Sequence, residues 1–75
     1  MNAKTRKEIE QMREKLNEMA YAFEEMQAEE QNKYDNMPEQ FQDSSTGERI
    51  QAWADALEDA FTAVNDAISA LEGVE

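Results

Sequence analysis

The sequence has neither cysteine nor histidine, and these absences exclude much of the chemistry open to a small protein. Without cysteine there is no disulfide framework, no thiol nucleophile and no zinc–thiolate site. Without histidine the chain lacks the usual general base and the commonest metal ligand. The candidate nucleophiles Ser44, Ser45, Thr46 and Ser69 have no neighbouring His or Lys that forms an activating pair in sequence. We therefore expect no enzymatic activity, no metal site and no cofactor.

Long apolar runs are absent as well. No stretch of roughly 18 apolar residues exists, so we expect no membrane-spanning segment. The basic start of the chain, residues 1–7, is not followed by an apolar run and does not resemble a secretory signal. We therefore expect an intracellular protein. Its 75 residues form one thin-cored domain without disulfides, and oligomerisation is the expected stabiliser.

Cations are scarce: seven basic residues stand against 18 acidic ones, for a net charge of −11. Residues 1–15 carry five basic and three acidic side chains, a net +2, and residues 16–75 carry the remaining −13. A small domain needs a net charge of only roughly 2–8 for solubility. The excess predicts repulsion from nucleic acid and anionic membranes, and attraction to a basic partner.

The N-terminal half predicts one long helix, from about residue 3 to 33. Apolar residues recur in steps of three and four, the spacing of a helix that packs lengthwise on another; they are Ile9, Met12, Leu16, Met19, Phe23 and Met26. The three methionines on this stripe are expected in the core. The alternative is an open stripe that serves as an adaptable binding surface.

The connection, residues 34–45, contains Pro38, which forbids one continuous helix. A single helical turn at 38–42 is plausible, and Met37 and Phe41 are expected to cover the end of the core. Ser45 and Glu48 fit a capping box that opens a second helix over about 46–72, with Gly73 as its stop. Its apolar stripe comprises Ile50, Trp53, Ala54, Leu57, Ala60, Phe61, Val64, Ile68 and Leu71.

These elements predict an all-α fold: a single domain, 1–75, in which two long antiparallel helices form an αα-hairpin. The second stripe is wider than one partner helix can cover. We therefore expect two hairpins to pair as a homodimeric four-helix bundle.

Acidic residues gather on one line of each helix, opposite its apolar stripe. The N-terminal acidic line comprises Glu14, Glu18, Glu25 and Glu29, and the C-terminal acidic line comprises Glu48, Asp55, Asp59 and Asp66. Both contain like-charge pairs four residues apart, and each such pair costs a few tenths of a kcal/mol of helix stability. These eight residues are the candidate contacts for a basic partner; a solvated outer face is the alternative.

The hairpin tip offers a second candidate site, a small ligand pocket. Its candidate residues are Tyr34, Met37, Phe41, Arg49 and Trp53. Arg49 is the only cation within fifteen residues on either side. It either forms a salt bridge with Glu48 or Asp43, or holds a phosphate or carboxylate. Core packing is the other interpretation of Trp53.

Residues 30–72 resemble small acidic helical proteins encoded by bacteriophages and prophages. The resemblance rests on the segment 35–49, on Trp53 and on Leu57–Ala60. Such proteins include anti-CRISPRs and other DNA mimics, which occlude the nucleic-acid channels of host machinery, so the resemblance implies action in the cytoplasm of a bacterial host. A weaker similarity, at Pro38, Glu48–Arg49 and Leu57–Ala60, is to the hairpins of phage sponges that sequester cyclic nucleotides in anti-CBASS and anti-Thoeris defence.

Three functional hypotheses follow. The leading one is a phage-type inhibitor that docks its acidic lines onto a basic host protein, such as a nuclease or CRISPR effector, without contacting nucleic acid or membrane itself. The second is a coiled-coil structural or assembly module that acts through the methionine stripe. The third is a sponge for a cyclic nucleotide at the hairpin tip.

Overall fold

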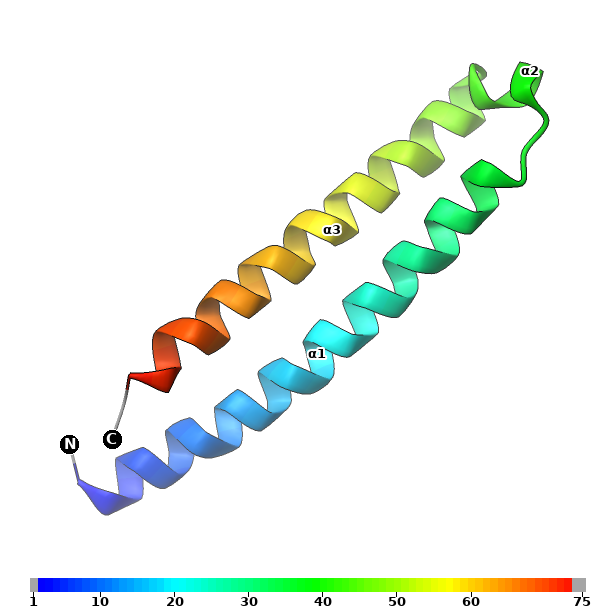
Figure 1. Ribbon diagram of the computed structural model, residues 1–75. Coiled ribbons are helices and arrows are strands. Elements are labelled where there is room, and N and C mark those ends of the chain that lie inside the picture. The colour runs from blue at the N-terminus through cyan, green and yellow to red at the C-terminus, as the bar shows by residue number, and fades with distance from the viewer. Residues whose placement is uncertain (1, 74–75) are drawn as a thin grey trace.

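A computed structural model describes residues 2–73 of the chain. Two long helices, α1 (Ala3–Asp35) and α3 (Ser45–Glu72), run antiparallel and pack lengthwise (Figure 1). A four-residue helix, α2 (Glu39–Gln42), lies in the connection at the tip. The all-α fold and the αα-hairpin are confirmed, with each long helix within two residues of its predicted bounds. The turn that follows Pro38 is confirmed too.

The packing between α1 and α3 follows a heptad pattern on both helices. On α3 a row of buried and half-buried positions recurs in steps of three and four; it comprises Gly47, Ile50, Ala54, Leu57, Phe61, Val64, Ile68 and Leu71. Gln51, Ala60, Asn65 and Ala67 are half-buried beside this row. On α1 the matching positions are Ile9, Arg13, Leu16, Ala20, Phe23, Gln27, Glu30 and Tyr34. These two rows of side chains form the centre of the interface between α1 and α3.

The methionines do not belong to that interface, and their placement in the core is wrong. Met12, Met19 and Met26 are 57%, 47% and 48% exposed. Each lies one residue before an interface position, while Ile9, Leu16 and Phe23 stay at the interface. The interface of α1 is therefore rotated by about 50°, half of the 100° step between successive residues, from the arrangement that hydrophobicity alone predicts. Arg13 and Gln27 take their place beside α3, where long polar side chains can pack through their aliphatic stems.

Two aromatic residues also lie outside the core. Trp53, expected in the stripe of the second helix, is 52% exposed, and Phe41, expected to cover the end of the core, is 51% exposed. The other residues of that stripe are buried or half-buried, as predicted. Met37 is half-buried at the tip. Among residues 2–73 the buried apolar side chains are only Ala20, Ala54 and Ile68.

The ends of the helices are fixed by side-chain and backbone hydrogen bonds. Asn2 caps α1, since its Oδ1 accepts from the Thr5 N–H at 2.8 Å. The cap of α3 is Ser44, not Ser45 as the capping box predicts: Ser44 Oγ accepts from the Gly47 N–H at 3.3 Å. The Ser44 hydroxyl also donates to the Phe41 carbonyl, which ties the cap to α2. Gly73 is the C-cap of α3, as expected, with a right-handed φ of −77°.

Gly47 is buried where α3 crosses the end of α2. A Cβ on Gly47 would lie 2.5 Å from the Phe41 carbonyl oxygen and closer still to that of Gln42. No flexible side chain is involved in this contact, so the backbone itself would have to move. Glycine at this position lets the connection turn back tightly onto α3.

Among residues 2–73, no helix combines the length and the apolar content that crossing a lipid bilayer requires.

Replacing Ser44 by alanine tests the capping register. We expect Ser44→Ala to lower the free energy of unfolding by about 1 kcal/mol, because the Gly47 N–H loses its acceptor. The matched control is Ser45→Ala, which removes the same hydroxyl one residue later and is expected to change stability by less than about 0.5 kcal/mol. Urea unfolding followed by circular dichroism measures both. A larger effect at Ser45 contradicts the assignment.

Gly47→Ala and Gly73→Ala form a second matched pair. Helix propensity alone makes alanine better than glycine by about 1 kcal/mol. At Gly47 the clash with the α2 carbonyls reverses this sign, and we expect a loss of roughly 1–3 kcal/mol. At Gly73 the new methyl group meets nothing within 4 Å, so no loss is expected. Thermal unfolding of the two variants distinguishes the steric effect from propensity.

Candidate functional site

The two acidic lines lie on opposite outer sides of the hairpin. All eight carboxylates of the two lines are exposed. At about 100° per residue, each line falls roughly 130–210° from the centre of its helix's buried row. The N-terminal acidic line therefore runs along the outer side of α1 and the C-terminal acidic line along the outer side of α3. The fold does not merge them into one patch.

A depression between the helices adds two carboxylates to this surface. Its volume is about 220 Å³, and it is lined by Glu24 and Gln27 from α1 and by Glu58 and Phe61 from α3. Glu24 and Glu58 thus line the same depression from different helices. Sequence reasoning missed this pair because it compared carboxylates only within one helix. A usable signal exists: each glutamate lies three residues before an interface residue of the same depression, Gln27 or Phe61.

The carboxylates are almost all unpaired. The described residues contain 17 acidic side chains, because one of the 18 in the sequence is Glu75. Within residues 2–73 the one ion pair joins Lys33 Nζ to Glu30 Oε1 at 2.8 Å. The hydrogen bond and charge of Glu30 raise the pKa of Lys33. Two other acids, Asp35 and Asp55, accept hydrogen bonds from the amides of Gln31 and Gln51.

The residues of the candidate tip pocket do not share one depression, and only Tyr34 and Trp53 line any of the depressions described here. Tyr34 lines one of about 300 Å³, together with Gln42, Asp43, Glu48, Gln51, Ala52 and Asp55. Gln42 Nε2 donates to the Tyr34 carbonyl at 2.9 Å, which fixes the connection against the end of α1. Trp53 lines a different depression of about 330 Å³, with Glu30, Ala56 and Leu57. Neither depression is lined by Met37, Phe41 or Arg49.

Arg49 is exposed and forms no ion pair within residues 2–73. Neither expected salt bridge, to Glu48 or to Asp43, is present. The depression nearest to it in sequence carries three acidic side chains and no cation. Across residues 2–73, no group of three or more acidic side chains is placed to hold a metal ion.

The second broad side of the hairpin is apolar. We call it the Met–Trp face; its residues are Met12, Met19 and Met26 of α1 and Trp53, Leu57, Ala60, Val64 and Ala67 of α3. On each helix these residues lie on the same rotational side of the centre of the buried row, at about 100° per residue; Leu57 and Val64 belong to that row and form its edge on this side. Because the helices are antiparallel, equal rotations bring them to one face. The shared depression of Glu30, Trp53 and Leu57 confirms this at the tip end.

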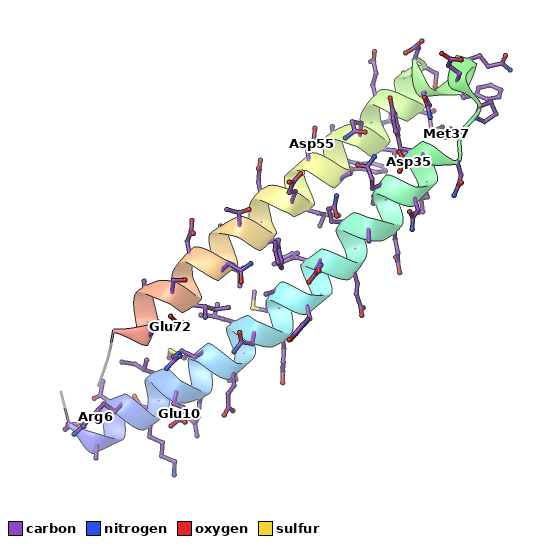
Figure 2. All side chains as sticks on the ribbon, in the orientation of Figure 1. Arg6, Glu10, Asp35, Met37, Asp55 and Glu72 are labelled. Carbon is purple, nitrogen blue, oxygen red and sulfur yellow. The ribbon has the colours of Figure 1, made fainter. Side chains whose placement is uncertain are left out.

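The same depressions show which residues of α1 and α3 lie at the same height along the length of the hairpin. We call this height the level of a residue. Glu24 and Gln27 share a depression with Glu58 and Phe61, and Glu30 shares one with Trp53 and Leu57. At successive levels the residue numbers therefore rise along α1 while they fall along α3. Met26 lies at the level of Ala60, and Met19 at the level of Ala67. Figure 2 shows Asp35 and Met37 together at the tip and Arg6, Glu10 and Glu72 together at the open end.

Comparison with known protein families, curated proteins and solved structures gives no significant match.

Glu58→Gln tests whether the interhelical carboxylates repel each other. Removing one charge beside Glu24 should raise the free energy of unfolding by a few tenths of a kcal/mol at low salt, the magnitude of a like-charge pair. At about 0.5 M salt, screening should remove the gain. Urea titrations at both salt concentrations measure it. Glu39→Gln, in the first turn of α2, is the control and should give no gain, since an acid there favours the helix.

Proposed function

We propose that the protein is a non-catalytic acidic binding protein that docks its carboxylates onto a basic partner. The observation that supports it is the exposure of both acidic lines with only one ion pair among residues 2–73. Combined with the resemblance to small acidic phage proteins, this observation favours a nucleic-acid-handling protein of a bacterial host as the partner, such as a nuclease or CRISPR effector. The proposed outcome is inhibition of that partner in the host cytoplasm.

The unpaired carboxylates lower the stability of the free helices, and a basic partner removes this destabilisation. Like charges along each line repel one another and weaken the helix. A basic groove that normally holds nucleic acid supplies many cations and relieves this repulsion when the hairpin enters it. Complementary charge of this kind raises the association rate and weakens steeply with salt. The hairpin is 58 Å long and 14 by 13 Å across, an elongated shape that suits an open groove.

Charge reversal of the C-terminal acidic line tests this proposal. The four replacements are Glu48→Lys, Asp55→Lys, Asp59→Lys and Asp66→Lys; each changes the charge by two, so the net charge moves from −11 to −3. A matched control with the same net charge carries Glu10→Lys, Asp35→Lys, Glu39→Lys and Glu72→Lys. The protein is first used to capture partners from bacterial lysate at low salt and at about 0.5 M salt, where screening shortens electrostatic reach.

A captured protein supports the proposal only if it binds nucleic acid and the hairpin competes with it. Anisotropy of a labelled DNA or RNA duplex measures this competition. We expect the line variant to compete roughly 100-fold less well, since it loses complementary charge, and the control variant to lose much less. Competition that is unaffected by the four line replacements overturns the proposal.

A second candidate function, a coiled-coil assembly module, is favoured by one specific observation. Met12, Met19 and Met26 recur every seventh residue and are about half exposed, which leaves a second apolar row on α1 without a partner. Such a module keeps its binding after charge reversal but loses it on Met19→Glu. The open row also supports pairing of two hairpins as a four-helix bundle, which we propose as the form in which the protein acts.

A further inference from the structure

We propose that the Met–Trp face is the surface on which a second copy of this chain docks, with the two hairpins antiparallel about a two-fold axis that passes between Met19 and Met26. This inference rests on the proposed pairing of hairpins and assigns its interface and symmetry. It does not depend on which basic partner the acidic lines bind.

The single hairpin leaves more surface exposed than a compact protein of its mass. Its accessible surface is 5654 Å². A compact monomer of 8.6 kDa is expected to expose about 4,700 Å². The excess of roughly 950 Å² is close to the ~800 Å² that each partner buries in a stable interface of standard size. One further copy is thus sufficient to bring the exposed surface to that of an ordinary folded protein.

Charge is distributed unevenly over the hairpin, and the Met–Trp face carries little of it. The central part of the Met–Trp face, from Met19 to Met26 on α1 and from Leu57 to Ala67 on α3, carries no charged residue of its own. Toward its ends it is flanked by Glu8, Lys15, Glu30, Lys33 and Arg49, a net +1. The rest of the chain then carries −12. Two copies with a net charge of −11 each therefore meet with the least repulsion on this face, and their acidic lines remain outside.

The levels of the methionines and of the charged residues on the Met–Trp face favour one orientation of the two copies. A two-fold axis that lies in the interface plane, perpendicular to the length of the hairpin and between the levels of Met19 and Met26, stacks α1 on the partner's α1 in the opposite direction and places Met19 beside the partner's Met26. It also stacks α3 on the partner's α3. On the two facing α1 helices the same operation sets Lys15 at the level of the partner's Glu30, an opposite charge.

The parallel alternative, with the axis along the hairpin, is less favourable. It sets Arg49 at the level of the partner's Arg49 and Lys33 at the level of the partner's Lys33, which places like charges at the tip. The antiparallel arrangement is also isologous, since the same patch is used by both copies and no surface is left open for a third. It therefore closes as a dimer.

Sedimentation equilibrium of the full chain tests the pairing. We expect the wild type to have twice the mass of the 8.6 kDa chain. Met19→Glu should weaken the dimer by roughly 100-fold or more, because each copy would bury an unpaired carboxylate. The matched control is Tyr21→Glu, which places the same charge at a position 71% exposed on the other side of α1 and should leave the dimer intact. Circular dichroism verifies that both variants remain helical.

Disulfide trapping tests the orientation without relying on a destabilised variant. The chain has no cysteine, so single replacements are unambiguous. When Met19→Cys and Met26→Cys proteins are mixed and oxidised, the antiparallel dimer predicts a mixed disulfide in excess of either like pair. Like pairs alone overturn the orientation. A monomeric wild type, or a dimer weakened by Tyr21→Glu and not by Met19→Glu, overturns the assignment of the face.

These results are separable from the test of acidic binding. A chain that remains monomeric but still competes for the nucleic-acid site refutes the paired form alone. A chain that dimerises as described but competes equally well after reversal of the C-terminal acidic line refutes only the docking of the acidic surface. A monomer that loses a host partner on Met19→Glu assigns the face to a different protein and overturns the second copy as its occupant.

Discussion

One layer of side chains between two antiparallel helices holds the hairpin together. On α3 the heptad steps from Gly47 to Leu71 are strict, and small residues at Ala20 and Ala54 allow the helix axes to approach. This layer fixes the rotation of both helices about their axes. Every other feature of the surface depends on that rotation, because it decides which residues face the partner helix, which face outward and which are left at the two sides.

The rotation gives the hairpin two unlike sides and separates the acidic lines. One side carries Glu24 and Glu58 around a shared depression, and the other carries the Met–Trp face. Two-helix packing cannot bury an apolar row on each of two sides of the same helix, so part of the apolar surface of α1 remains open. The charges are concentrated away from that open row, and the two proposals above assign self-association to the open row and partner binding to the charges.

Much of this fold follows from the sequence. Steps of three and four, one proline and the scarcity of glycine were sufficient for two helices, their bounds and their antiparallel order. The register of α1 was not predictable from hydrophobicity, because Met12, Met19 and Met26 score better than their neighbours Arg13, Ala20 and Gln27. Packing against α3 overrides that preference. The choice between Ser44 and Ser45 as the cap was equally hidden, since it depends on how α2 turns back. The acidic lines were visible in advance, whereas the Glu24–Glu58 pair needed the interhelical register.

The antiparallel order also has a consequence for the dipoles of the two helices. The first turns of α1 carry Lys4, Arg6 and Lys7 and no acid in the first turn, which is unfavourable for the dipole of α1 itself. α3 ends without a basic residue in its last turn. Because the helices are antiparallel, α3 ends beside the N-terminal part of α1 (Figure 1), so the basic segment 4–15 of α1, including Arg13 and Lys15, lies around the negative end of α3. The basic beginning of the chain thus acts across the fold: it compensates a helix that begins some forty residues later in the sequence.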